Sequence, residues 1–307
     1  MMESARHCIR KTKIFMDTIV DIQVVYAANW SEADVTIQIE RAFDSFRLVE
    51  NTCSRFEPSS ELMRLCAQIG MAVPVSPILF EPLKFAVEIA AYTDGVFDPA
   101  IGRKMELQGF DRNYVSGERM NHIVDDSASY RDILIDEVNR MVTLKRSMVL
   151  DLGAVAKGFA IDLASVHLQE FEGFIVNAGG DLYVGGSDVE GNPWRIGIQH
   201  PLHEDEWIDE VELLDMAICT SGGYERKSER DADAHHIIHV KTGVSPTEVI
   251  SCSVIAPFAM LADGCSTALM LLGMEKRKEF IEEMGVKVML LSPDLDVLTI
   301  GDDPDVV

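Results

Sequence analysis

The sequence predicts an α+β fold in which helices pack against mixed or antiparallel sheets. Strand-like and helix-like segments follow one another without the regular alternation that is typical of a doubly wound parallel sheet. The chain has 307 residues, 47% of them hydrophobic, so it can build a full core. It contains no internal repeat, low-complexity tract or linker, which favours one large domain or two closely packed lobes.

Hydrophobic periodicity and helix-start signals define the expected elements. β-Branched residues with partial alternation indicate strands, whereas apolar residues at spacings of three and four indicate helices. Capping serines and Ser76-Pro77 mark helix starts, and Pro82 weakens the first turn of the third helix. We expect helices at about 31–49, from 59 or 60, and at about 78–92, 155–170, 258–272 and 275–284. We expect strands at 14–25, 133–135, 141–144, 174–176, 194–198, 216–219, 236–238, 249–255, 286–291 and 297–300.

The two ends of the chain differ from the rest. Residues 1–13 are polar and mixed in charge and are expected as an N-terminal extension of a domain over 14–300, with 301–307 as a frayed acidic tail. The first residues lack the apolar stretch of a signal peptide, and no segment approaches the roughly 20 apolar residues of a membrane span. The six cysteines are scattered without a C-x-x-C pair, as in reducing compartments. We therefore expect a cytoplasmic protein without a membrane anchor.

The charge of the chain excludes two classes of partner. There are 27 Lys and Arg residues against 51 Asp and Glu residues, a formal charge of −24. A nucleic-acid backbone or an anionic membrane surface requires clustered cations, so we expect neither as a partner. The surplus carboxylates are compatible with a bound hard cation and equally with adaptation to salt.

Residues 150–162 are a candidate anion site. A strand is expected to end at Asp151, Gly153 forms the turn, and a helix begins near Ala154. The free N–H groups at a helix start suit phosphate, and Lys157 in the first turn favours a nearby anion. Gly158 permits a close approach by another group. Ordinary strand–helix packing explains the same pattern equally well.

Two further glycine-marked segments have weaker signals. In residues 94–102, Asp98 could accept a hydrogen bond from a ligand, or it could close an ordinary turn after a helix. In residues 176–186, Gly179-Gly180 followed by Asp181 indicates either a close backbone approach to a ligand or a hairpin turn.

The segment 235–239 contains three histidines, and Thr220-Ser-Gly-Gly lies upstream of it. His235 and His239 have the spacing of a helical zinc pair, but Ile237-Ile238 favours a strand and no glutamate completes an H-E-x-x-H motif. A catalytic or orienting histidine is the better interpretation, because neutral imidazole accepts protons near pH 7.

Asp263 and Thr267 lie one helical turn apart in an apolar segment. A carboxylate and a hydroxyl are ligands that suit Mg²⁺. Alternatively, Thr267 bonds within its own helix while Asp263 is solvated.

Taken in order, these segments resemble the ApbE family, the FAD:protein FMN transferases. The resemblance runs from about Met16 to Leu291 and implies an ApbE-like, T-fold-like architecture. Each motif is weak alone, but their order along the chain is specific. The motifs that carry the resemblance are LDLGAVAKG (150–158), VNAGGD (176–181), TSG (220–222), HHII (235–238) with TG (242–243), and ADGCSTA (262–268).

The resemblance implies a reaction and a set of roles. The family cleaves the pyrophosphate of FAD with Mg²⁺, transfers FMN to a threonine or serine hydroxyl of a protein, and releases AMP. It implies a metal site at the Ala154 carbonyl, Asp263 and Thr267, and a base at His236. Lys157 and the metal would neutralise the pyrophosphate. The implied flavin contacts are Met16, Phe56, Val96, Phe97, Asp98, Asp151, Lys157 and Ile237.

The chain departs from the family pattern mainly at the implied flavin-ring end. Examples are Met16-Asp17-Thr18, Phe56 in place of a tyrosine, and His239-Val240 in place of Asp-Pro. The metal and phosphate positions are intact. Two other functions stay open, a pyrophosphatase that uses water as acceptor and a flavin-binding relative without turnover. No D-G-x-[ST]-G-A-[ST]-like acceptor motif occurs in this chain, so the expected partner is a separate protein that carries one.

Overall fold

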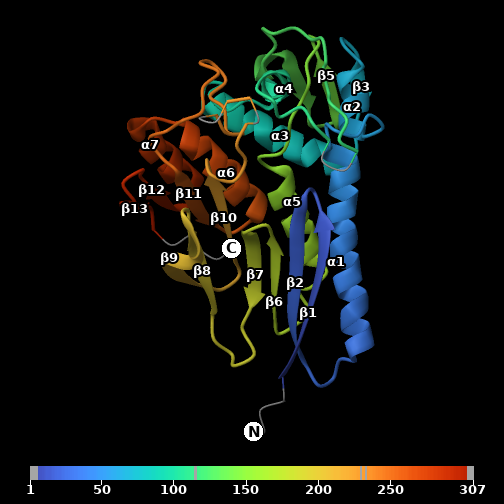
Figure 1. The fold of residues 1–307 in the computed structure, drawn as a ribbon. Coiled ribbons are helices and arrows are strands. Elements are labelled where there is room, and N and C mark those ends of the chain that lie inside the picture. The colour runs from blue at the N-terminus through green and yellow to red at the C-terminus, as the bar shows by residue number, and fades with distance from the viewer. Residues whose placement is uncertain (1–5, 114–115, 229, 232–233, 303–307) are drawn as a thin grey trace.

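An eight-stranded antiparallel sheet organises the fold (Figure 1). We describe the chain from a computed structural model, which covers residues 6–113, 116–228, 230–231 and 234–302. The strand order across the sheet is β1-β2-β6-β7-β10-β11-β12-β13. These strands are β1 (Arg6–Phe15), β2 (Thr18–Ala27), β6 (Gly173–Ala178), β7 (Asp181–Gly186), β10 (Met216–Gly222), β11 (Ser251–Ala256), β12 (Lys287–Leu291) and β13 (Val297–Ile300).

The start of the chain differs from the sequence prediction. The single strand expected at 14–25 is a hairpin, because the chain reverses at Met16 and Asp17, which have φ angles of 51° and 59°. Asp17 is a residue type that accepts such a φ angle, but without a glycine or asparagine beside it the turn signal is weak. Residues 6–13, expected as part of an extension, lie in β1 and pair with β2. Residues 303–307 of the expected acidic tail lie outside the described part of the chain.

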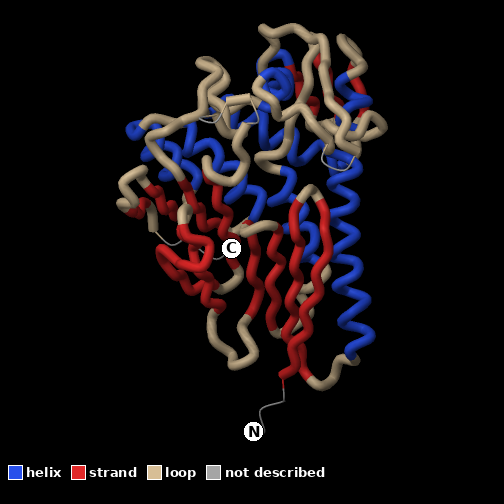
Figure 2. Tube along the Cα trace, in the orientation of Figure 1, coloured by secondary structure: helices blue, strands red, loops and turns tan. Residues whose placement is uncertain are grey.

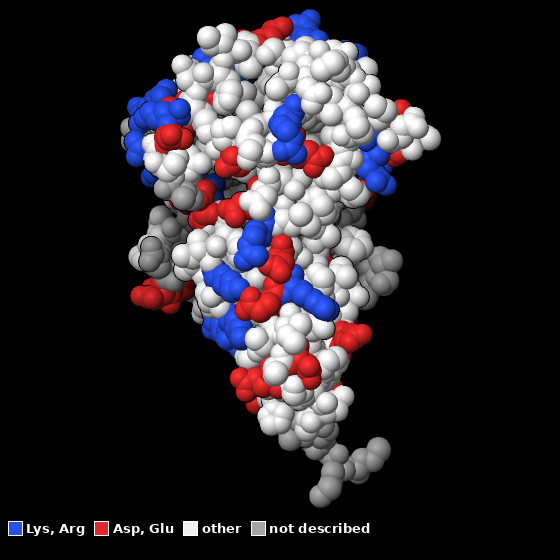
Figure 3. Space-filling model, turned by 90° about the vertical axis from the view of Figure 1, so that its right-hand side faces the viewer, with Lys and Arg blue, Asp and Glu red and all other residues white. Residues whose placement is uncertain are grey.

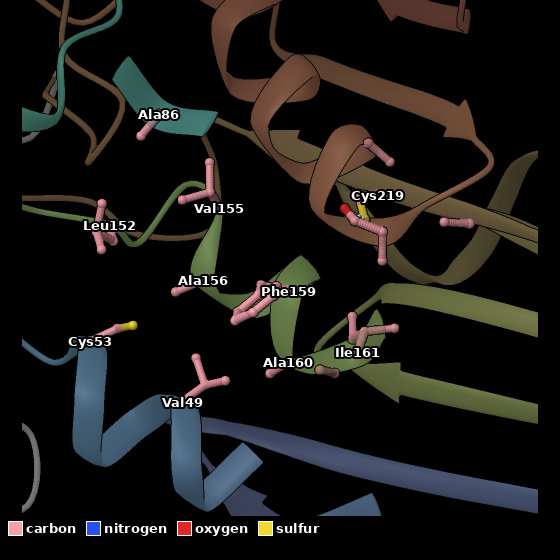
Figure 4. Packing of buried hydrophobic residues seen from close by; sticks show 14 of the residues in the cluster. Val49, Cys53, Ala86, Leu152, Val155, Ala156, Phe159, Ala160, Ile161 and Cys219 are labelled. Carbon is pink, nitrogen blue, oxygen red and sulfur yellow. Dashed lines mark hydrogen bonds between the residues drawn. The ribbon is translucent and has the colours of Figure 1, made fainter. Parts of the chain in front are cut away.

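Helices cover one face of the sheet and extend beyond its end. α5 packs between α1 and α6, and α6 packs against β10 and β11. Figure 4 shows Phe159 and Ala160 of α5 beside Val49 of α1, all within the main hydrophobic core. These helices are α1 (Glu32–Cys53), α3 (Pro77–Tyr92), α5 (Ala156–Val166), α6 (Ala259–Leu271) and α7 (Met274–Met284).

A loop-rich part of the molecule lies beyond the helices, at the top of the view in Figure 2. Its three-stranded sheet has the order β3-β5-β4. On the opposite face of the large sheet, the β8–β9 hairpin closes a second hydrophobic cluster. The elements are α2 (Glu61–Cys66), β3 (Ala72–Pro74), η1 (Pro99–Ile101), α4 (Gly102–Leu107), η2 (Tyr130–Asp132), β4 (Ile133–Asp136), β5 (Met141–Leu144), β8 (Trp194–His200) and β9 (His203–Leu213).

Most expected helices and strands are confirmed, and the differences have local causes. α5 ends at Val166, four residues before the expected end. The strand expected at 236–238 is absent, since this segment makes only isolated bridges at His235 and His239. The sequence did not predict β9, because its acidic residues hide the alternation, or β7, because glycines end it. Within the described residues, no helix has both the length and the apolar character needed to span a membrane.

Asp162 of α5 connects the two central helices. Its two carboxylate oxygens accept hydrogen bonds from the N–H groups of Ala259 and Met260, at 2.7 and 2.9 Å, at the start of α6. Burial raises the pKa of Asp162 to about 7, although both N–H donors favour the charged form. The helix start therefore obtains its capping group from a neighbouring helix rather than from its own N-cap, Phe258.

We predict that Asp162→Ala lowers the free energy of unfolding by about 1–2 kcal/mol, the usual cost of losing a helix cap. The reason is that two N–H groups at the start of α6 lose their acceptors. Urea unfolding followed by circular dichroism measures the change. Asp44→Ala, at an exposed carboxylate of α1, is the control and should change stability little. Equal stability of both variants would contradict the capping role.

Candidate functional site

A cavity of about 200 Å³ opens where α5, α6 and the end of β10 meet residues 225–226 and 236–238. Sequence reasoning placed ten of its lining residues in the site. They are Phe56, Phe97, Asp98, Asp151, Ala154, Lys157, His236, Ile237, Asp263 and Thr267. Two other candidates, Met16 and Val96, do not line the cavity. Met16 lies in the β1–β2 turn, where its N–H donates to Glu50.

The cavity also has lining residues that sequence reasoning did not assign to the site. Ser221 and Thr220 belong to the TSG motif, so their signal was available. The charged side chains Arg55, Glu225 and Arg226 carry no motif, and only the folded chain brings them to the cavity. The remaining ones are Ile101, Met105, Phe110, Gly153, Ile238 and Leu271.

Gly158 joins α5 to α6 at the floor of the site. A Cβ atom on Gly158 would lie 2.3 Å from the carbonyl oxygen of Ala259, so the contact leaves no room for a side chain. This agrees with the close approach expected from the sequence. The N–H of Gly158 donates to Oδ2 of Asp263 at 2.9 Å. The start of α5 is thereby fixed against the helix that carries Asp263 and Thr267.

The charges at this junction are tightly arranged. Lys157 forms an ion pair with Asp181, whose Oδ1 accepts a hydrogen bond from the Thr220 N–H at 2.8 Å. Burial raises the pKa of Asp263, whereas Lys157 and the Gly158 N–H act in the opposite direction. The anion expected near Lys157 is thus Asp181 in this structure. Asp263 faces the cavity as a buried carboxylate that would gain from an added positive charge.

A chain of hydroxyl groups orients Thr267. The Ser266 hydroxyl donates to the main-chain oxygen of Asp263 at 2.9 Å, and a carbonyl can only accept. In its 2.7 Å contact with Ser266, Ser221 must therefore be the donor, because a hydroxyl has one proton. It follows that Thr267 donates to Ser221 in their 3.0 Å contact. The lone pairs of Thr267 stay available to the cavity, where a cation or a donor can use them.

Asp263, Thr267 and Ala154 all line the cavity, and their carboxylate, hydroxyl and carbonyl oxygens are ligand types that suit a hard cation. Thr267 is oriented as an acceptor and Asp263 is a buried carboxylate, so both fit such a role. In the part of the chain that the structure describes, no three His, Cys, Asp or Glu side chains gather as a metal site. The three oxygen donors proposed here are not such a group, because only one of them, Asp263, is a carboxylate.

The two neighbouring histidines have different surroundings. His235 is buried, and its ring nitrogens lie 3.0 Å from the Pro246 oxygen and 3.3 Å from the Ile237 nitrogen. His236 lines the cavity, and its buried Nδ1 has no hydrogen-bond partner among the described residues. Burial, followed by the charge of Arg226, lowers the pKa of His236 to about 3. His236 is therefore the neutral imidazole that faces the site.

Aromatic and charged groups form the other end of the cavity. The Arg55 guanidinium lies 4.0 Å from the ring centre of Phe56 and forms an ion pair with Asp151. Burial opposes the charge on Asp151, but Arg55 and the Gly153 N–H keep its pKa below the usual value. The oxygens of Asp98 accept from two main-chain N–H groups, at 2.9 and 3.0 Å. Asp98 therefore lines the cavity and also closes a turn, as in the simpler interpretation.

We predict that His236 makes the protein sensitive to acid. Its pKa is about 3 in the folded chain and about 6.5 for an unperturbed histidine, so the unfolded chain binds the proton first as the pH falls. The free energy of unfolding should fall between pH 6.5 and 3, by at most about 1.4 kcal/mol per pH unit from this group.

Urea unfolding of the wild type and of His236→Gln at several pH values isolates this effect. The comparison between proteins is needed because Asp162, whose pKa is raised, acts in the opposite direction over part of this range. The wild type should lose stability relative to the variant as the pH falls. The same pH dependence in both proteins would contradict the burial of a neutral His236.

Comparisons with known proteins identify the family of this chain. The model of the ApbE family matches residues 16–290. The FAD:protein FMN transferase of Salmonella typhimurium is 31% identical over 289 residues, which are 89% of this chain and 80% of that protein. The FAD:protein FMN transferase of Haemophilus influenzae is 26% identical over 311 residues, 95% of this chain and 90% of that protein.

Solved structures show the same fold. The ApbE protein from Thermotoga maritima has a TM-score of 0.82 at 27% identity, with 95% of this chain and 96% of that chain covered. The flavin transferase ApbE from Vibrio cholerae has a TM-score of 0.79 at 23% identity, with 96% and 97% covered. The expected ApbE-like fold is confirmed, and this chain belongs to the ApbE family.

Proposed function

We propose that this protein is an FAD:protein FMN transferase that moves FMN from FAD to a threonine or serine hydroxyl of an acceptor protein. AMP is the second product. One observation carries the proposal, namely the oxygen set of Asp263, Thr267 and Ala154 beside Lys157 in one cavity. The names of the curated relatives support the same activity.

The transfer exchanges one bond to phosphorus. The acceptor oxygen forms a bond to the phosphorus of the FMN half, and the bond from that phosphorus to the bridging oxygen breaks. AMP leaves with the bridging oxygen, and the hydroxyl proton passes to a base. The reaction needs neutralisation of the phosphate charge and accurate positioning more than covalent help from the protein.

Lys157 and the start of α5 are suited to hold the pyrophosphate. The dipole of the helix start favours an anion, and the ammonium adds a full positive charge. The ion pair with Asp181 holds that ammonium at the cavity, since Asp181 is itself bound to the Thr220 N–H. In our proposal Lys157 binds phosphate oxygens and stabilises the leaving AMP.

Asp263, Thr267 and the Ala154 carbonyl would hold Mg²⁺. Their chemistry fits, because all three donors are oxygens and Thr267 is oriented to present its lone pairs. When bound, Mg²⁺ supplies positive charge to the pyrophosphate oxygens. The Gly158 N–H keeps Asp263 oriented through its hydrogen bond, which leaves the other carboxylate oxygen for the cavity.

His236 is the proposed base. His236 lines the cavity, its buried Nδ1 has no partner among the described residues, and His235 is engaged through both ring nitrogens. A base with a pKa of about 3 holds a proton weakly, but negative phosphates nearby raise the pKa of an imidazole. Bound FAD would therefore move His236 toward the range in which it accepts a proton.

The flavin is proposed to occupy the end of the cavity that contains Phe56 and Phe97. Aromatic rings and the apolar side chain of Ile237 suit the isoalloxazine system. Asp98 and Asp151 lie beside them, and both already accept main-chain hydrogen bonds. They are expected to shape this end of the cavity and to contact the flavin edge.

We predict that the purified protein labels a peptide. The probe is a synthetic peptide with the sequence D-G-x-T-G-A-T, incubated with FAD and Mg²⁺. The peptide should gain one FMN, and AMP should appear in equal amount, as measured by mass spectrometry and chromatography. Asp263→Asn should reduce the rate by at least about 10³-fold, because the cation site loses its only carboxylate.

The products distinguish the competing functions. FMN and AMP without a labelled peptide would show a pyrophosphatase that uses water. FAD binding without any product would show a flavin-binding relative. Full activity of Asp263→Asn would contradict the metal assignment while leaving the transfer itself intact. The matched control is Asp44→Asn, at an exposed carboxylate of α1.

We predict that Ser221→Ala weakens cation binding by roughly tenfold, as is typical for a partner that orients a metal ligand. The Thr267 hydroxyl then loses its hydrogen-bond acceptor. Its proton can turn toward the cavity, where it opposes a bound cation. Titration with Mn²⁺, followed by electron paramagnetic resonance, measures affinity without turnover. Ser253→Ala is the control, because Ser253 bonds to Thr220 on the other sheet face. Equal affinities in both variants would exclude the hydroxyl chain.

A further inference from the structure

A second cavity lies on the opposite face of the large sheet, between the sheet and the β8–β9 hairpin. It has a volume of about 410 Å³. We call it the hairpin groove and define it by its apolar walls. These are Ile175, Leu182 and Ile218 of the sheet, with Ile196, Ile198 and Trp207 of the hairpin.

The hairpin groove adjoins the candidate active site. Thr220 and Glu225 line both cavities. Along β10, Ile218 and Thr220 point to the groove side, whereas Ser221 points to the helices and contacts Thr267. The groove and the oxygen set are therefore separated by the width of one strand.

The end of the groove beside the active site is lined by two glycines. It is formed by the β6–β7 turn at Gly179 and Gly180, whose φ angles are 66° and 100°. Both glycines are exposed, and a Cβ on Gly180 would meet no atom within 4 Å. Gly180 therefore places no side chain in the way of a polypeptide that crosses this turn, whereas Gly179 packs against the Thr18 side chain.

Trp207 is the main exposed group of the groove. Its side chain is 68% exposed, and its ring covers Gly197 of β8, where an added Cβ would lie 2.5 Å from the ring. Tryptophans that lie partly open beside an apolar pocket are frequent anchors in protein recognition. The groove thus combines an aromatic anchor with an apolar floor.

We propose that the hairpin groove binds an extended segment of the acceptor protein and directs its hydroxyl past Thr220 to the phosphate end of the active site. This inference rests on the proposed function. Transfer to a protein needs a path that a polypeptide can use while FAD occupies the first cavity. The bound segment carries apolar side chains toward Trp207 and small residues at the Gly179-Gly180 turn.

The other cavities lined by the described residues fit the binding of an acceptor segment less well. The cavity beside Ala100 and Lys104 has a volume of about 10 Å³ and adjoins the active site only at Asp98, at the flavin end. The cavity at Leu107 and Arg230 shares no lining residue with the active site. The hairpin groove alone among them meets the active site beside the partner of Lys157.

The test is Trp207→Ala with the peptide and FAD assay described above. The KM for the peptide should rise by about tenfold, the effect of losing one anchor side chain. The KM for FAD should stay unchanged. Trp207→Phe should restore most of the peptide affinity, because an aromatic ring is kept. Leu202→Ala, at the exposed tip of the same hairpin but outside the groove, should behave as the wild type.

Three results would overturn the proposal. An unchanged KM for the peptide in Trp207→Ala would exclude the groove and leave the transferase function intact. A raised KM for FAD alone would assign the groove to the AMP half of FAD. Absence of peptide labelling by the wild type would remove the proposed function and the groove together.

Discussion

The site depends on reciprocal hydrogen bonds between α5 and α6, in which each helix contributes one aspartate as acceptor. Asp263 of α6 accepts the N–H of Gly158 in α5, and Asp162 of α5 accepts two N–H groups at the start of α6. Each helix thus supplies acceptors for N–H groups of the other. A buried N–H group without an acceptor would cost free energy. The reciprocal bonding is possible because Gly158 lets the two backbones meet. It places Ala154, Lys157 and Thr267 around one cavity, although Gly158 and Asp263 are 105 residues apart in the sequence.

The net charge of −24 describes the surface and not the site. Figure 3 shows one face on which Lys and Arg side chains lie among Asp and Glu side chains, without a large patch of one sign. Around the cavity, the cations Arg55, Lys157 and Arg226 lie among four carboxylates, so the positive field is local to Lys157 and the dipole at the start of α5. An acidic protein can bind an anion because fields at short range inside a cavity outweigh the screened charge of the surface.

The sequence was informative where chemistry and local structure coincide. Ser31, Ser60 and Ser76 cap the helices that they were expected to start, and Asp263 and Thr267 share one face of α6. It failed where only tertiary contacts decide the outcome. The chain reverses at Met16 and Asp17 because β1 and β2 pair, and residues 236–238 form no strand because the His235 ring binds the local backbone. Arg226 reaches the cavity from a segment without a motif, and Arg55, although it is next to Phe56, gains its place only through the ion pair with Asp151.

β10 is the element on which both substrates of the proposed reaction depend. Successive residues of a strand point to opposite faces, so Thr220 and Ser221 serve different sides of a wall one strand thick. The pairing of Ile218 with Leu182, and of Thr220 with Ser253, fixes which residue faces which side. A shift of one residue would turn Ser221 away from Thr267 and place Thr220 among the helices. Asp181 secures the edge of the wall, since one of its oxygens holds the Thr220 N–H and the other holds Lys157. The position of the Lys157 ammonium is therefore coupled to β10, the strand that separates the two cavities. A group bound in either cavity is positioned relative to this strand.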